Sequence, residues 1–242
     1  MFNDKIIKEM FFARLHLGHF STKWNPKMKK YVFCKQNGKY IIDLIQTVYY
    51  LKKVCNFIKK LSIEGKKILF VSARMLIVDK LKHFANVTKS FYITEDWLGG
   101  TFTNWITTKG CIDKLNYYKF NSSVDGLKLY DSLTKRERLI SRKQQSKLAK
   151  YYFGIKQMKK IPDVVFLIGQ SDLKKAIGEC LKLNVPTISI LFCLDTDCDP
   201  TMTNFFIPAN DDSISSIFFI LDFVKYYMLK GGKKISKRLV FN

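Results

Sequence analysis

The stretch from residue 97 to residue 105 reads Trp97-Leu98-Gly99-Gly100-Thr101-Phe102-Thr103-Asn104-Trp105, and the rest of the chain is organised around it. Adjacent glycines indicate a tight turn that reaches positive φ or passes close to another group. Thr103 and Asn104 are good N-cap residues, so we expect a helix to begin near Trp105. The free N–H groups of a helix start suit an anion, but a strand-to-helix joint with tryptophan in the core also explains the stretch, and we favour that simpler explanation. The residues expected to form this structural motif are Trp97, Gly99, Gly100, Thr103 and Asn104.

The chain is strongly basic, with 42 Lys and Arg residues against 20 Asp and Glu residues, a formal net charge of +22 over 242 residues. A globular protein with this self-repulsion usually has a polyanionic partner. Nucleic acid is the leading candidate, and an anionic membrane surface is the second. We find no run of 18 apolar residues, so we expect no membrane span. The start of the chain resembles neither a signal peptide nor a transit peptide, so we expect the protein to act in the compartment where it is made.

Two further features of the composition bear on the compartment. Six cysteines are scattered without a C-x-x-C pair, which is typical of reduced and mostly buried thiols. Lys, Ile, Phe, Asn and Tyr are used heavily, and their codons are mostly AT-rich. This bias indicates an AT-rich genome, such as that of an organelle.

Strand-like and helix-like segments alternate along the chain. We predict strands at residues 66–72, 90–94, 163–168, 186–191 and 205–207, and helices at 43–61, 74–86, 172–183 and from 210 to about 229. In the helix at 172–183 the side chains expected to point inward are Leu173, Ile177, Cys180 and Leu181. The alternation predicts an α/β fold with a Rossmann-like, doubly wound parallel sheet.

A pair of helices interrupts this alternation. Thr134-x-x-Glu137 is a capping box that opens a helix at 133–153, and a loop at 119–132 joins it to a helix beginning near residue 105. We therefore predict an inserted, basic helical hairpin of the coiled-coil type. Its candidate RNA contacts are Arg136, Arg142 and Lys143, although an ordinary solvated helix face has the same composition.

We expect three parts in the chain. Residues 1–104 and 154–230 form the α/β domain, residues 105–153 form the hairpin, and residues 231–242 form a basic tail. The domain includes an N-terminal basic loop at 15–40, in which lysines flank an aromatic residue. This mixture suits a phosphate backbone with unpaired bases, but a solvated loop with Trp24 turned inward also explains it. The candidate RNA contacts in this loop are Lys23, Trp24, Asn25, Lys27, Lys29 and Lys30.

Motifs for small-molecule chemistry are missing from the sequence. It contains neither G-x-G-x-x-G nor G-x-x-x-x-G-K-[ST], and the first core strand ends in Ser72-Ala73-Arg74 without a glycine, which argues against NAD or ATP. Asp195-x-Asp197-x-Asp199 lacks the glycine and glutamate of a calcium loop. The pairs His16/His19 and Cys193/Cys198 do not have a recognised zinc-ligand spacing. We expect no enzyme activity, no cofactor and no protein-held metal, although Mg²⁺ bound through RNA remains open.

Several motifs in a fixed order resemble one known family. They are Gly18-His19, Trp24-Asn25-Pro26-Lys27-Met28, Trp97-Leu98-Gly99-Gly100, Thr103-Asn104-Trp105, Pro162-Asp163 and Pro208-Ala209-Asn210-Asp211-Asp212. This order resembles the bacterial-type ribosomal protein S-two family, the second protein of the small ribosomal subunit. The resemblance implies a Rossmann-like domain with a coiled-coil hairpin and a structural, non-enzymatic role. It implies small-subunit ribosomal RNA and neighbouring ribosomal proteins as partners, with no membrane partner and no homo-oligomer.

Details of the resemblance refine these expectations. The segments Pro208–Asp212 and Arg238-Leu239-Val240-Phe241 look like those of plastid members, so we expect a plastid ribosome, with mitochondrial and bacterial origins left open. Arg74 keeps the positive charge that the family carries after its first core strand and is a further candidate RNA contact. Glu95-Asp96 stand where the family usually has basic residues, which favours packing or protein contact there. The rival interpretations are a nucleotide-dependent enzyme on the same fold and a free RNA chaperone.

Overall fold

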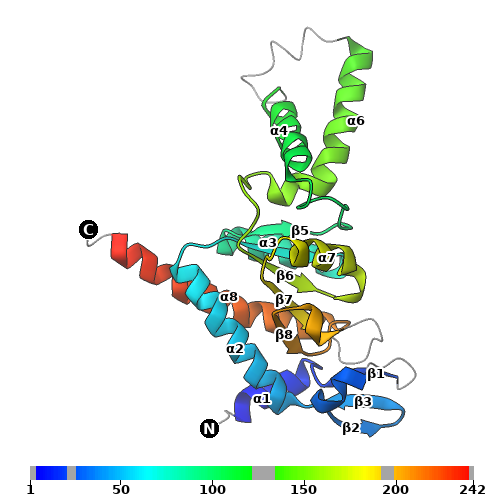
Figure 1. Ribbon diagram of the computed structural model, residues 1–242, viewed down its shortest axis with the longest axis vertical. Helices are drawn as coiled ribbons and strands as arrows, with labels where there is room; N and C mark the ends of the chain where they lie inside the picture. Colours follow the sequence, from blue (N-terminus) through cyan, green and yellow to red (C-terminus); the bar gives the residue numbers. More distant parts are fainter. Residues whose placement is uncertain (1–3, 21–25, 122–133, 192–198, 240–242) are drawn as a thin grey trace.

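The computed structural model describes residues 4–20, 26–121, 134–191 and 199–239. Its centre is a sheet of five parallel strands in the order β5-β4-β6-β7-β8 (Figure 1). The strands are β4 (Ile68–Ser72), β5 (Phe91–Ile93), β6 (Val164–Ile168), β7 (Thr187–Leu191) and β8 (Phe205–Pro208). Each falls within one residue or two of a predicted strand, so the predicted α/β fold with a parallel sheet is confirmed.

Both faces of the sheet are covered, which explains why the strands are apolar without alternation. Every residue of β4, β6 and β7 is buried. One face packs against α1 (Asp4–Phe12), α2 (Leu44–Ile63), α3 (Val78–Thr88) and α8 (Ile214–Leu239). The other face packs against α7 (Lys174–Lys182), α4 (Trp105–Asn121) and the stretch that includes Trp97. The sheet is therefore doubly wound.

The strand order reverses between β4 and β6. From β4 the chain moves outward to β5 at one edge and then returns to β6 on the other side of β4. β7 and β8 continue in this second direction. The carboxyl ends of β4 and β6 therefore meet at a topological switch point, the place where open α/β sheets hold their ligands.

Two helices that lie between β5 and β6 in the sequence project beyond the sheet, although α4 also packs on one of its faces through Ile112. They are α4 and α6 (Lys135–Tyr152), and Figure 1 shows both projecting away from the edge of the sheet that carries β5. They contact each other where the Tyr118 hydroxyl donates to Gln144 Oε1 at 2.6 Å. Thr134 and Glu137 form the predicted capping box at the start of α6. The predicted loop at 119–132 lies mostly outside the described residues.

The N-terminal basic segment contains a second sheet, so the prediction of a loop at 15–40 is wrong in part. β1 (Leu17–Phe20), β3 (Lys39–Ile42) and β2 (Val32–Gln36) pair antiparallel in that order, and the 3₁₀ turn η1 (Pro26–Tyr31) precedes β2. Asn37 and Gly38 join β2 to β3 with φ of 48° and 75°. An Asn-Gly pair at positive φ is a strong hairpin signal, and the short, basic strands around it concealed that signal.

The last helix is longer than predicted. We expected it to end near residue 229, before a basic tail at 231–242, but α8 continues to Leu239. Gly231 and Gly232 suggested a helix end because glycine favours C-caps. Gly231 instead lies where α8 crosses α2, and a Cβ there would come within 2.7 Å of Ser62 Cβ and 2.9 Å of the Lys59 carbonyl oxygen. This glycine serves close helix packing rather than termination.

One predicted core residue is on the surface. Leu181 was expected to point inward from the helix after β6, but its side chain is 51% exposed. The buried residues of α7 are Ala176, Ile177, Glu179 and Cys180. Successive side chains are about 100° apart around a helix axis, so Leu181 lies about 120° from the middle of the face that these four buried residues share. Leu181 was assigned to the buried face because apolar side chains were expected there, but the charged side chain of Glu179 is buried instead.

Candidate nucleic-acid interface

The stretch at 97–105 wraps around a buried carboxylate. Glu179 reaches it from α7, and its Oε1 atom accepts hydrogen bonds from Trp97 Nε1 at 3.0 Å and from Gly100 N at 2.7 Å. Its Oε2 atom accepts from the backbone N–H groups of Phe102 at 2.8 Å and Thr103 at 3.0 Å. Glu179 is only 8% exposed. The anion that the glycines and the helix start are suited to hold is therefore a side chain of the same protein.

The protonation state of Glu179 follows from these contacts. Burial alone would raise the pKa of this carboxyl, but the hydrogen bonds from Trp97, Thr103, Phe102 and Gly100 outweigh burial and lower the pKa. Glu179 is therefore ionised at neutral pH, and its charge is satisfied entirely by N–H groups and one hydroxyl. The site is a structural clamp between α7 and the loop before α4.

The other residues of this stretch form the joint between strand and helix. Trp97 is 6% exposed and packs edge-on against Phe102, with ring centroids 4.8 Å apart. Gly100 has φ of 89°, which a residue with a side chain rarely adopts. The Asn104 carbonyl accepts from Thr108 N, so α4 begins at Trp105 as expected. The structure therefore favours the strand-to-helix joint over an external anion site.

Sequence reasoning missed Glu179. Its signal was a lone acidic residue within the apolar stripe of the predicted helix at 172–183, between Ala176 and Cys180. A buried carboxylate at such a place needs several donors. The stretch at 97–105 was already expected to offer free N–H donors, because it contains adjacent glycines and the start of a helix.

The switch point of the sheet holds an arginine instead of a ligand site. Arg74 follows β4 and pairs through Nη2 with Asp211 Oδ2 at 3.3 Å and through Nη1 with Asp212 Oδ1 at 2.7 Å. Burial alone would lower the pKa of Arg74, but Asp211 and Asp212 raise it. Gly169, after β6, has φ of 87°, and a Cβ there would lie 3.2 Å from Arg74 Nε. Arg74 therefore fills the position beside both strand ends, and its charge is directed at carboxylates of this chain.

The N-terminal lysines are presented by a 3₁₀ turn. In η1 the side chains of Met28 and Tyr31 are 0% and 3% exposed and anchor the turn against Ile42 and Leu191. The i and i+3 positions share one face of such a turn. Lys29 and Lys30, which lie between them, and Lys27, which precedes Met28, are exposed as a result. Lys23, Trp24 and Asn25 lie outside the described residues.

One of these lysines already has a partner. Lys27 Nζ forms an ion pair with Asp199 Oδ2, and the bonds from Lys27 and Thr201 lower the pKa of Asp199 to about 2. The Asp199 carbonyl also accepts from Gln170 Nε2 at 2.9 Å. Asp199 therefore ties η1 to the carboxyl edge of the main sheet. Lys29 and Lys30 remain at the surface beside this anchor.

The hairpin residues lie far from the N-terminal lysines. Arg136, Arg142 and Lys143 are all exposed on α6, which has no buried residue. Figure 1 places α6 at one end of the molecule and the small sheet with η1 at the other. Lys150 Nζ lies 3.4 Å from Glu95 Oε2, so the acidic residue before Trp97 pairs with the base of α6. The structure thus separates the candidate contacts into two groups instead of joining them.

The metal interpretations find little support in the part of the chain that the structure describes. No cluster of three or more His, Cys, Asp or Glu side chains suitable for a metal occurs among the described residues. His16 is buried, which lowers its pKa, and it stacks on Phe11. The side chains of His19, Cys193, Cys198, Asp195 and Asp197 are outside the described set. Within the same set, none of the helices is long and apolar enough to cross a membrane.

Comparison with known proteins assigns the family. Residues 10–231 match the family described as Ribosomal protein S2. A small ribosomal subunit protein uS2c from Euglena longa is 97% identical over 242 residues, 100% of both chains. A uS2c protein from Oltmannsiellopsis viridis is 41% identical over 96% of this chain and 95% of its own. A uS2 protein from Synechococcus sp. (strain JA-3-3Ab) is 40% identical over 86% of this chain and 76% of its own. The resemblance inferred from the motifs is confirmed, and the chain belongs to the ribosomal protein S2 family.

Proposed function

We propose that this chain holds ribosomal RNA at two separate basic surfaces, one at each end of the molecule. The N-terminal surface consists of Lys27, Lys29 and Lys30, and the hairpin surface consists of Arg136, Arg142 and Lys143. The wider role follows from the family. The chain is a structural constituent of the small ribosomal subunit that acts in translation in the plastid, and it is not an enzyme.

The character of α6 supports the hairpin surface. None of its 18 residues is buried. The helix carries seven basic side chains and one acidic side chain, Glu137. Its apolar residues Leu139 and Ile140 are themselves 59% and 48% exposed, so most of the helix gains little from packing and needs another source of stability. Polyanionic RNA supplies that stability by neutralising the arginine and lysine side chains.

The arrangement of η1 supports the N-terminal surface. Met28 and Tyr31 fix the turn on the core, and Asp199 fixes Lys27 from the side. Lys29 and Lys30 are therefore presented from a rigid base, which lowers the entropy lost when they bind phosphate. We include Lys23, Trp24 and Asn25 in this surface on their sequence alone.

Several finer assignments belong to the same proposal. Residues 1–104 and 154–230 act as the scaffold domain and residues 105–153 as an RNA-facing arm. Arg74 supports the scaffold through Asp211 and Asp212 more than it contacts RNA. The partners are small-subunit ribosomal RNA and adjoining ribosomal proteins, without a membrane or a second copy of the chain. Any Mg²⁺ at the interface between the protein and the RNA is bound through RNA phosphates.

Charge reversal tests the two surfaces separately. Binding of the purified full chain to small-subunit ribosomal RNA is measured by filter binding at several KCl concentrations. We expect the variant K29E/K30E to lower the slope of log K against log salt by about 2, since each phosphate contact contributes about 0.9 in duplex nucleic acid. The variant R136E/R142E/K143E should lower it by about 3 on the same basis.

A charge-matched variant provides the control. Lys175 and Lys182 are exposed on α7, outside both surfaces, so K175E/K182E changes the net charge as much as K29E/K30E does. We expect it to alter the slope by less than about 1. Equal slopes for K29E/K30E and K175E/K182E would reject the N-terminal surface, because the general charge of the protein would then explain the salt dependence.

A further inference from the structure

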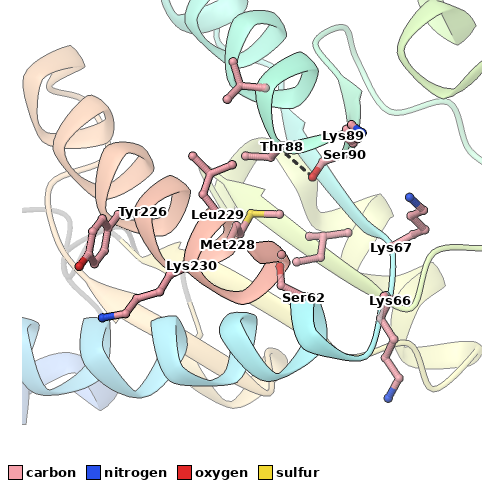
Figure 2. Close-up of a pocket in the computed structure, with 14 residues that line it drawn as sticks. Ser62, Lys66, Lys67, Thr88, Lys89, Ser90, Tyr226, Met228, Leu229 and Lys230 are labelled. Atoms are coloured by element: carbon pink, nitrogen blue, oxygen red, sulfur yellow. Dashed lines mark hydrogen bonds between the residues drawn. The ribbon is translucent and has the colours of Figure 1, made fainter. Parts of the chain in front are cut away.

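An open hollow lies at the amino end of the sheet, on the side opposite the switch point. It is lined by the ends of α2 and α3, the start of β4 and the second half of α8, and its volume is about 840 Å³ (Figure 2). Ile68 and Met228 are buried at 2% and 6% exposure. Val87 and Leu229 are 38% and 39% exposed, so apolar side chains remain open to solvent here. The hollow is separate from both basic surfaces.

The charged residues that line the hollow are all basic, with Glu64 beside them. Among the described residues, four lysines line it, and no aspartate or glutamate does. Lys66 pairs with Glu64 at 2.7 Å, and Lys230 lies over the Tyr226 ring at 5.5 Å. Within the described part of the chain, no ion pair joins Lys67, Lys89 or Lys230 to a carboxylate. A partner that enters the hollow therefore meets an apolar centre within a positive rim.

A glycine in α8 supplies a second, independent observation. Gly232 lines the hollow, and a Cβ added to it would meet no atom within 4 Å. Glycine inside a helix costs about 1 kcal/mol relative to alanine. Packing explains Gly231, which touches α2, but it does not explain Gly232. The open space beside Gly232 lets another backbone approach α8 closely.

We propose that this hollow receives a short, acidic, amphipathic segment of a neighbouring protein in the small ribosomal subunit. Its apolar side chains lie between Val87 and Leu229, and its carboxylates face Lys67, Lys89 and Lys230. The inference rests on the proposed function, because the partner is another protein of the same particle. The aliphatic lining favours protein over RNA, since interfaces with nucleic acid are more polar and depend on phosphate contacts.

Photo-crosslinking in assembled particles tests this assignment. A benzophenone amino acid replaces Val87 in the full chain, small subunits that contain it are purified and irradiated, and crosslinked products are identified by mass spectrometry. We expect one protein segment that carries apolar residues flanked by Asp or Glu. A crosslink to ribosomal RNA, a crosslink to a basic segment, or no crosslink in particles that contain the chain would overturn the proposal.

Substitutions in the hollow sharpen the test. Leu229→Glu and Gly232→Leu should each lower the crosslink yield about tenfold, since anchors at the centre of an interface dominate its affinity. Leu181→Glu is the control, because Leu181 is similarly exposed on α7, away from the hollow. It should leave the yield unchanged, and an equal loss with Leu181→Glu would also overturn the proposal. Absence of the chain from small subunits would reject the proposed function itself, which distinguishes the two failures.

Discussion

At the scale of single residues, Glu179 determines how the stretch at 97–105 folds. One carboxylate accepts from Trp97 Nε1 and from the backbone N–H groups of Gly100, Phe102 and Thr103. Hydrogen bonds to a charged group are roughly twice as strong as neutral ones. Replacing the carboxylate therefore affects the loop, the start of α4 and α7 together.

We predict that Glu179→Gln lowers the free energy of unfolding by about 2–4 kcal/mol, because an amide nitrogen would face N–H donors in a buried site. Urea unfolding followed by circular dichroism measures the change. Glu64→Gln is the control, since Glu64 pairs with Lys66 at an exposed site and should cost less than about 1 kcal/mol. Equal losses in the two variants would show that the clamp contributes nothing of its own.

The lowered pKa of Glu179 also predicts an acid dependence. Its pKa in the folded protein lies below the ordinary value of 4.5, so the unfolded chain binds the proton more readily. The stabilisation is complete above pH 4.5 and is lost as the pH falls through the folded pKa. Unfolding free energies between pH 7 and pH 3 should therefore fall more steeply for the parent chain than for Glu179→Gln. Parallel curves would contradict the assignment.

At the scale of elements, the helices and strands of the main sheet were predictable because their patterns are local. Five apolar runs predicted the five strands, and the helix predicted at 43–61 is α2, which has Asp43 as its N-cap. The small N-terminal sheet was missed because its strands are only four or five residues long, and β2 is mostly exposed with little apolar periodicity. The end of α8 was missed because a packing glycine and a terminating glycine look identical in the sequence.

The adjacent glycines of α8 separate these two roles by experiment. We predict that Gly231→Ala lowers the free energy of unfolding by about 1–2 kcal/mol, because the new methyl group would press against α2 at the crossing. Gly232→Ala has open space and should stabilise the helix by up to about 1 kcal/mol. Thermal unfolding of both variants measures the difference. Stabilisation by both substitutions would mean that α8 does not cross α2 as described.

At the scale of the whole molecule, the protein is a doubly wound scaffold whose usual ligand position is closed by its own charges. Arg74 with Asp211 and Asp212 occupies the switch point, and Glu179 occupies the helix-start anion site. The sequence indicated that nucleotide motifs are missing, but it could not show that distant carboxylates fill both places. That pairing depends on contacts between residues more than 75 positions apart in the chain. We propose that the basic side chains at the two ends of the molecule face RNA.

The most direct test of this account is sedimentation of a native lysate on a sucrose gradient at high magnesium, with quantitative mass spectrometry of each fraction. We predict that the chain is present at one copy per particle in the small-subunit peak and remains there after a moderate salt wash. A free RNA chaperone would be displaced by that wash. Recovery of the chain only at the top of the gradient would contradict its role as a structural constituent of the small ribosomal subunit.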